Sequence, residues 1–193
     1  LASNEEQQQF SQALKGLTSS LRNARRQREM AVTLRPIEPR DNLALAEIIR
    51  NSFRENKIDH LEGVSLHDPG LERLSEIYNV PGSAYWIAEA NGELLGGAGL
   101  APLQGAGAEY CEMQKLYFTS KVKGSGLGRR LIALVLSEAE KRGYQHCYLE
   151  TLPELSAAVR LYEAFGFHYL NSPVGNTGHS SCDIRMLKSF NTN

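Results

Sequence analysis

The chain has 193 residues, of which 41% are hydrophobic and 22% are charged, so it can bury a sizeable core and is not wholly disordered. Its formal net charge of -1 argues against a protein that binds nucleic acid directly by general electrostatic attraction. Three widely spaced cysteines without a CxxC pair, and apolar runs that stay short, favour a reduced cytoplasmic protein with no metal site and no membrane span.

Residues 1–29 predict an amphipathic helix that is distinct from the rest of the chain. Ser3 and Glu6 are spaced as a capping box that would start it. Steps of four and three then give a narrow apolar seam made of Phe10, Leu14, Leu17, Leu21 and Ala24. The seam fits a helix packed on its own domain and equally a helix that joins two copies in a homodimer. The segment resembles the last helix of a MarR-type regulator, and Leu1 at the start with Met30 before the next element favours the remnant of a larger fusion.

Residues 30–193 alternate between strand and helix patterns and predict one α/β domain. Strands are expected at 32–35, 84–89, 94–100, 110–118, 147–151, 166–170 and 181–187. Helices are expected at 43–53, 131–139 and 154–164, with an interrupted helical stretch at 60–80. Asn91 and Gly92 predict a tight hairpin between two of the strands. Strands that pair first as hairpins and later alternate with helices predict a mixed sheet with helices on both faces.

A glycine-rich turn, KGSGLG at residues 123–128, joins the strand at 110–118 to the next helix. The first amides of a helix lack partners within it and attract anions, and glycines let the main chain approach phosphate oxygens closely. Lys123 and Arg129 add positive charge at its rim. The spacing does not match G-x-G-x-x-G, and the absence of a Gly-Lys-Ser/Thr end disfavours a nucleotide-binding P-loop. On these grounds the turn is either a phosphate site or merely a tight turn.

Two motifs give the turn a context. The strand EMQKLYF at 112–118, followed by the turn at 123–128, is similar to the central acetyl-CoA motif of the GNAT acetyltransferases, with Lys123 at the place of their Gln or Arg. The segment LYEAFGF at 161–167 resembles the LYExxGF signature of that family, and the resemblance extends over residues 32–188. It implies the GNAT fold, with a mixed, mostly antiparallel sheet. It also implies an N-acetyltransferase that moves an acetyl group from acetyl-CoA to an amine of a small molecule or a peptide.

The resemblance further implies where acetyl-CoA binds. The pantetheine arm is expected along the strand at 116–118, and the pyrophosphate on the amides of the turn. Many relatives carry an Asn seven residues before the signature tyrosine; here Leu155 stands there, so that contact is absent or is supplied by Ser156. The expected cofactor-binding residues are Leu116, Tyr117, Phe118, Lys123, Gly124, Ser125, Gly126, Leu127, Gly128, Arg129, Ser156 and Tyr162.

Acetyl transfer needs a neutral amine, so a general base is valuable: a lysine-like amine costs about 4 to 5 kcal/mol to deprotonate at pH 7. Glu112 and Glu150, on neighbouring strands, are the two candidates, and we favour Glu112. Strand periodicity predicts that Glu112 shares a face with Gln114, Leu116 and Phe118. Either carboxylate could instead be a structural group held by hydrogen bonds or an ion pair.

The family resemblance assigns Tyr162 as the donor of a proton to the departing thiolate, with core packing of its ring as the alternative. The main-chain N–H of Phe118 is expected to polarise the thioester carbonyl. His179 lies in a polar loop before the last strand, where it could line the acceptor pocket, act as a base or be a surface residue. An acetyl-CoA-binding regulatory module without catalysis is the alternative function.

Overall fold

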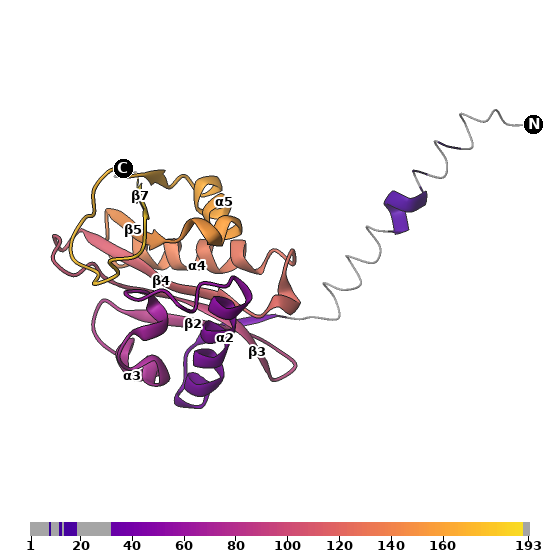
Figure 1. Ribbon diagram of the computed structural model, residues 1–193, viewed down its shortest axis with the longest axis horizontal. Helices are drawn as coiled ribbons and strands as arrows, with labels where there is room; N and C mark the ends of the chain where they lie inside the picture. Colours follow the sequence, from indigo (N-terminus) through magenta and orange to yellow (C-terminus); the bar gives the residue numbers. More distant parts are fainter. Residues whose placement is uncertain (1–7, 9–11, 13, 19–31, 191–193) are drawn as a thin grey trace, which may run out of the picture.

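The computed structural model describes residues 8, 12, 14–18 and 32–190. Its centre is a seven-stranded sheet in the order β1-β2-β3-β4-β5-β7-β6, with α2 and α3 on one face and α4 and α5 on the other (Figure 1). The strands are β1 (Thr33–Pro36), β2 (Ala84–Ala90), β3 (Glu93–Pro102), β4 (Tyr110–Phe118), β5 (His146–Thr151), β6 (His168–Tyr169) and β7 (Ile184–Ser189). The helices are α2 (Asn42–Glu55), α3 (Leu74–Ile77), α4 (Leu127–Lys141) and α5 (Ser156–Ala164). Single 3-10 turns are η1 (Pro39–Asp41), η2 (Ser65–His67), η3 (Leu71–Arg73), η4 (Ser120–Val122) and η5 (Pro153–Leu155).

Among the described strands, every pairing is antiparallel except that of β4 with β5. The expected mixed, mostly antiparallel sheet is therefore confirmed. The β2–β3 hairpin turns at Asn91 and Gly92, whose φ angles of 52° and 77° match the two left-handed positions of a type I′ turn. Glycine and asparagine adopt such angles at low cost, which is why this connection could be read from two residues.

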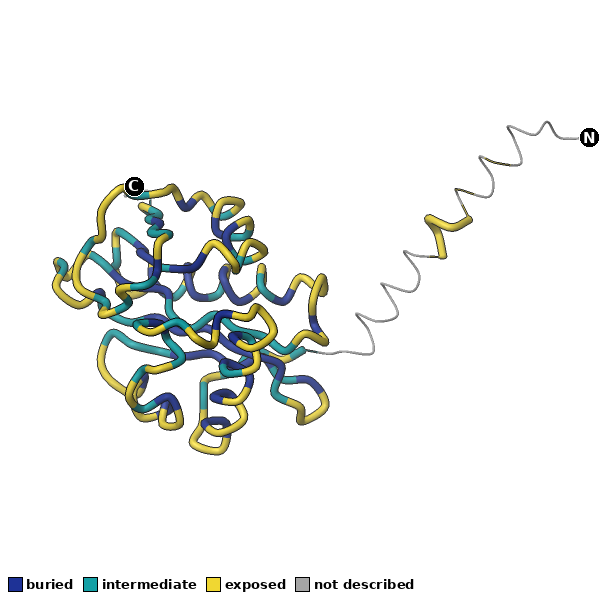
Figure 2. Tube along the Cα trace, viewed as in Figure 1, coloured by how far each residue is buried: buried dark blue, intermediate teal, exposed yellow. Residues whose placement is uncertain are grey.

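Two apolar cores flank the sheet, one for each helical layer. On the side of α4 and α5, Leu131, Ile132 and Val135 of α4 are fully buried together with Met186 of β7. On the side of α2, its residues Leu45, Ile49 and Phe53 pack with Tyr85 and Ile87 of β2. The dark blue segments of Figure 2 accordingly follow the sheet and the helix sides that face it. Both helices owe this placement to apolar residues repeating every three or four positions.

Several predicted elements have different bounds in the structure, and three of them show why. Residues 60–80 form only η2, η3 and the one-turn helix α3, because Pro69 and Gly70 interrupt them and Gly70 adopts a φ of 84°. The predicted helix at 131–139 begins earlier, at Leu127, directly after Gly126 with a φ of 81°. The last strand begins at Ile184 rather than at 181, since residues 175–182 belong to a loop that contacts the site described below.

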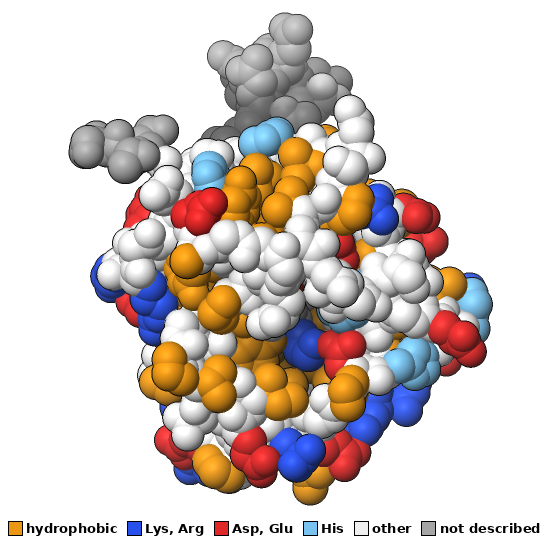
Figure 3. Space-filling view, turned by 90° about the vertical axis from the view of Figure 1, so that its left-hand side faces the viewer, with side chains coloured by type: hydrophobic (Ala, Val, Ile, Leu, Met, Phe, Trp, Pro, Cys, Tyr) orange, Lys and Arg blue, Asp and Glu red, His pale blue; other side chains and the backbone are white. Residues whose placement is uncertain are grey.

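Most of the predicted helix at 1–29 lies outside the described residues. Leu14 and Leu17, the two described members of its apolar seam, are helical and are 49% and 61% exposed. The homodimer, the MarR-like helix and the fused origin therefore stay predictions. No described helix combines the length and the apolar character that crossing a membrane requires. On the face drawn in Figure 3, basic and acidic side chains lie interspersed with apolar ones.

Candidate active site

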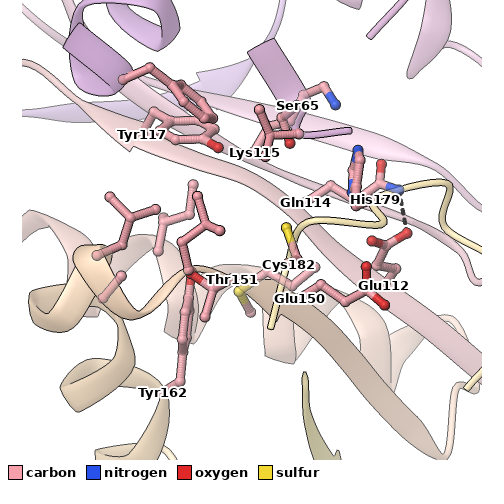
Figure 4. A pocket seen from close by; sticks show the side chains of 17 residues that line it. Ser65, Glu112, Gln114, Lys115, Tyr117, Glu150, Thr151, Tyr162, His179 and Cys182 are labelled. Carbon is pink, nitrogen blue, oxygen red and sulfur yellow. Dashed lines mark hydrogen bonds between the residues drawn. The ribbon is translucent and has the colours of Figure 1, made fainter. Parts of the chain in front are cut away.

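The site begins where the two parallel strands of the sheet separate. β4 and β5 pair only from Tyr110 to Glu112 on β4 and from His146 to Tyr148 on β5. Beyond that point β4 stays with β3, whereas β5 stays with β7 up to Thr151. The carboxyl-terminal halves of the two strands therefore form the walls of a cleft (Figure 4).

A β-bulge shapes the wall that β4 contributes. Gly97 and Gly99 of β3 stand opposite Tyr117 and Gln114, so two steps on β3 face three on β4. Lys115, within this stretch, has a φ of 51°, in the left-handed region that a residue with a side chain seldom adopts. A bulge bends a strand and changes the direction of its side chains.

The bulge makes one sequence prediction wrong. Glu112 and Gln114 do lie together on the α2 side, where Gln114 bonds to Tyr78. After Lys115, however, Tyr117 packs on Phe53 of α2, with ring centroids 5.7 Å apart. Leu116 and Phe118 turn to the core of α4 and α5 instead. They do not share the face of Glu112, because strict two-residue alternation fails where a strand carries an extra residue.

The glycine-rich turn ends at the amino terminus of α4 with free amides. Three N–H groups here have acceptors. That of Ser125 donates to the Val122 carbonyl at 3.0 Å, and that of Leu127 to the Ser125 hydroxyl at 3.3 Å. The N–H of Arg130 donates to the Gly126 carbonyl at 3.2 Å. Within the described part of the chain, the N–H groups of Gly126, Gly128 and Arg129 donate to no acceptor. The turn can therefore offer several donors to an anion at the positive end of the helix.

An open groove of about 620 Å³ runs from this turn to the cleft. It is lined by most of the predicted cofactor-binding residues, namely Leu116, Tyr117, Phe118, Lys123, Gly124, Gly126, Leu127, Gly128, Arg129 and Ser156. Ser125 does not line it. A side chain at Gly124 or Gly126 would meet nothing within 4 Å, which leaves space over the turn, whereas Gly128 packs against Leu161.

A narrow pocket continues the groove between β4 and β5. The two cavities share Leu116, Tyr117, Leu155 and Ala158, so they form one path. Tyr162 projects from α5 toward this pocket (Figure 4). The residue is 6% exposed, and its ring packs edge-on against Phe167, with centroids 5.8 Å apart. The ring thus belongs to the core while the residue lines the pocket, and burial raises the pKa of Tyr162 well above its ordinary value.

Glu112 is buried on β4, with 4% of its surface exposed. Burial raises the pKa of its carboxyl group to about 7, although the hydrogen bond from Gln114 opposes this. The Gln114 amide donates to Glu112 Oε2 at 2.6 Å, and its carbonyl oxygen accepts from the Tyr78 hydroxyl at 2.7 Å. The dashed line of Figure 4 marks the first of these bonds. A carboxyl group with this pKa can both take up and release a proton near neutral pH.

Glu150, across the cleft, is held differently. The Tyr148 hydroxyl donates to its Oε1 at 2.6 Å, and the Thr177 hydroxyl donates to its Oε2 at 2.5 Å. Both oxygens already accept a bond, so Glu150 is more constrained than Glu112.

A cluster of Asp68, Lys115 and His179 lies at the edge of the pocket, which Lys115 and His179 line, and was largely missed in the sequence. His179 Nε2 lies 3.1 Å from Asp68 Oδ1, and the ammonium of Lys115 forms an ion pair with the same carboxylate. The hydrogen bond to Asp68 raises the pKa of His179, whose side chain is 14% exposed and is not a surface residue. Burial opposes ionisation of Asp68, but His179 and Lys115 outweigh it and lower its pKa. Lys115 and His179 are 47 and 111 positions away from Asp68, so no local pattern connects them.

The described residues contain no group of three or more His, Cys, Asp or Glu side chains that could hold a metal ion.

Comparison with known proteins shows relatives over most of the chain. Residues 44–167 match the model of the acetyltransferase (GNAT) family. The uncharacterized N-acetyltransferase YjgM of Escherichia coli (strain K12) is 39% identical over 157 residues, which are 81% of this chain and 94% of the relative. The PaiA N-acetyltransferase of Thermoplasma acidophilum, solved with coenzyme A, has a TM-score of 0.65 at 19% identity, covering 83% of this chain and 100% of that one. The putative acetyltransferase YncA of Salmonella typhimurium, solved with acetyl-CoA, has a TM-score of 0.65 at 18% identity, covering 84% and 95%.

Proposed function

The chain belongs to the GNAT acetyltransferase family and is therefore an acyltransferase, and from this premise we propose that it moves an acetyl group from acetyl-CoA to an amine, with Glu112 as general base and Tyr162 as general acid. One observation carries the proposal. The groove that begins at the free amides of the turn leads into the pocket that holds both of these side chains.

The groove suits the elongated shape of acetyl-CoA. Its pyrophosphate would accept hydrogen bonds from Gly126, Gly128 and Arg129, each aided by about 0.3 to 1 kcal/mol from the helix dipole. Its pantetheine arm would lie along Leu116 to Phe118, where β4 no longer has β5 as a neighbour. The thioester would then reach the narrow pocket, and the N–H of Phe118 remains the expected donor to its carbonyl oxygen.

Glu112 suits the role of base better than Glu150. A carboxyl group with a pKa of about 7 is partly ionised at neutral pH and is basic enough to accept a proton from an attacking amine. Glu150 already accepts two hydroxyl hydrogen bonds, which occupy both of its oxygens. We assign Glu150 the role of holding the loop residue Thr177 over the pocket.

Proton transfer closes the reaction. The acceptor nitrogen attacks the carbonyl carbon, a C–N bond forms, the C–S bond breaks, and the amine proton passes to Glu112. The raised pKa of Tyr162 keeps its hydroxyl protonated, so that it can donate a proton to the leaving sulfur. Tyr162 then regains a proton from solvent, and Glu112 releases to solvent the proton that it took from the amine. A thiol of pKa about 8.5 is already a fair leaving group, so this donor accelerates the reaction rather than making it possible.

The test is release of free CoA from acetyl-CoA in the presence of a panel of amines, alongside calorimetric titration with acetyl-CoA. The wild type should turn over, and Glu112→Gln should lower kcat by about 100-fold or more while keeping cofactor affinity. Glu150→Gln is the matched control and should cost less. Tight binding of acetyl-CoA without turnover of any amine would instead identify a regulatory module.

A further inference from the structure

The roles proposed above do not involve Lys115, although its position in the structure is unusual. It lies in the bulge of β4, and its side chain lines the narrow pocket together with Glu112 and His179. Although the residue is polar and long, its side chain is only 8% exposed. A lysine is seldom buried to this degree unless its charge has a function or a full set of partners.

The partners of Lys115 are incomplete. An ammonium group has three N–H donors, and in the described part of the chain Lys115 Nζ bonds only to Asp68. Asp68 is itself shared, because its carboxylate also accepts from His179 Nε2 at 3.1 Å. One carboxylate therefore faces two basic groups, and this end of the pocket has an excess of hydrogen-bond donors and of positive charge. A buried donor without an acceptor is costly, which favours a ligand oxygen in this place.

The opposite end of the pocket has the reverse character. Figure 4 shows Lys115, Gln114 and His179 above the carboxyl groups of Glu112 and Glu150. An amine entering between Glu112 and the thioester would be attracted by the carboxyl groups. A carboxylate on the same molecule would point to Lys115. This arrangement of charge is complementary to a zwitterion and unfavourable to a diamine, whose second ammonium would face Lys115.

The pocket also restricts the size of the acceptor. The loop at 175–182 is bonded to its surroundings at several points. These bonds are Asn176 N–H to the Gln104 carbonyl at 2.7 Å, Thr177 to Glu150 at 2.5 Å, and Ser181 N–H to the Gly63 carbonyl at 3.4 Å. A loop fixed in this way over a narrow pocket favours a small molecule over a folded protein chain.

We propose that the acceptor is a free α-amino acid and that Lys115 binds its carboxylate while Glu112 takes the proton of its amine. The inference rests on the function proposed above and specifies the acceptor for the same site.

The first test uses the unaltered enzyme. The 20 standard L-amino acids are screened for acetyl-CoA-dependent release of CoA, and the best one is compared with its amide and with its decarboxylated amine. A hydrogen bond to a charged group corresponds to a factor of about 10 to 100, so kcat/KM should be higher by this factor for the acid than for either analogue. Equal or better use of the decarboxylated amine would overturn the assignment of the acceptor but leave the acetyltransferase proposal intact. Binding of acetyl-CoA without acetylation of any amine would overturn both.

The second test locates the effect. Lys115→Met keeps an unbranched side chain without charge, and it should raise KM for the amino acid about 10- to 100-fold with little change in kcat. KM for the decarboxylated amine should stay within about threefold of the wild-type value, because this amine has no group for Lys115 to bind. Lys121→Met is the matched control, since this lysine is 68% exposed and pairs with Glu93 on the surface. A purely structural role in balancing Asp68 would affect both acceptors equally, and that result would refute the proposal. Thermal unfolding shows whether the variant is folded, and if it is not, the comparison of acceptors on the wild type decides alone.

Discussion

The hydrogen bond from Gln114 to Glu112 allows a direct test of what controls the proposed base. This bond, 2.6 Å long, stabilises the ionised form of the carboxyl group and opposes the effect of burial, which raises the pKa to about 7. Gln114→Leu keeps the approximate volume but removes the donor. The carboxyl group then loses its stabilising partner, so its pKa should rise further.

The size of the effect follows from the type of bond. A hydrogen bond to a charged group contributes about 1.5 to 3 kcal/mol, and one pH unit corresponds to about 1.4 kcal/mol. Because Glu112 must be ionised to accept a proton, wild-type activity should rise as the pH increases through about 7. In Gln114→Leu this rise should move upward by about one to two pH units, and the variant should recover much of its activity at pH 9.

The assay is the initial rate of CoA release at saturating acetyl-CoA between pH 5.5 and 9.5, with one acceptor for all enzymes so that its own ionisation is common to each profile. Tyr78→Phe removes only the hydroxyl that supports Gln114 and should give a smaller shift in the same direction. Gln145→Leu, the same chemical change at an exposed position, should leave the profile unchanged. A profile of Gln114→Leu that does not move, or that moves to lower pH, would refute the assignment of Glu112 as the base.

Three further predictions concern stability, cofactor binding and proton donation. Folding raises the pKa of Glu112 from 4.5 to about 7, so its burial lowers the stability of the protein as the pH rises through this range. Glu112→Gln should therefore raise the free energy of unfolding by up to about 3 kcal/mol at pH 8 and change it little at pH 5, as measured by urea unfolding. Gly126→Glu should abolish acetyl-CoA binding in calorimetry through its charge over the turn, whereas Gly143→Glu, at a similar φ of 82° but away from the groove, should keep it. Tyr162→Phe should retain cofactor affinity and lower kcat about 10-fold or more, and an unchanged kcat would exclude it as the acid.

Much of the fold could be predicted from the sequence, because the responsible signals are local. Asn91 and Gly92 determine a hairpin through angles that these two residues adopt easily. The apolar spacing of Leu131, Ile132 and Val135 directs one side of α4 to the sheet. The free amides of the glycine-rich turn could be predicted for the same reason, since the unpaired N–H groups at the start of a helix depend only on the helix itself.

The chemistry of the pocket depends on contacts that no short segment contains. The bulge at Lys115 arises from the pairing of β4 with β3, and β4 itself has no glycine to mark it, so alternation along β4 placed Leu116 and Phe118 on the wrong face. The cluster around Asp68 joins three segments that only the folded sheet brings together. Sequence periodicity and motifs thus determined the elements, their order along the chain and the glycine-rich turn before α4. The tertiary structure alone decided which titratable groups share a pocket and how far burial shifts their pKa values, because both depend on neighbours that are distant along the chain.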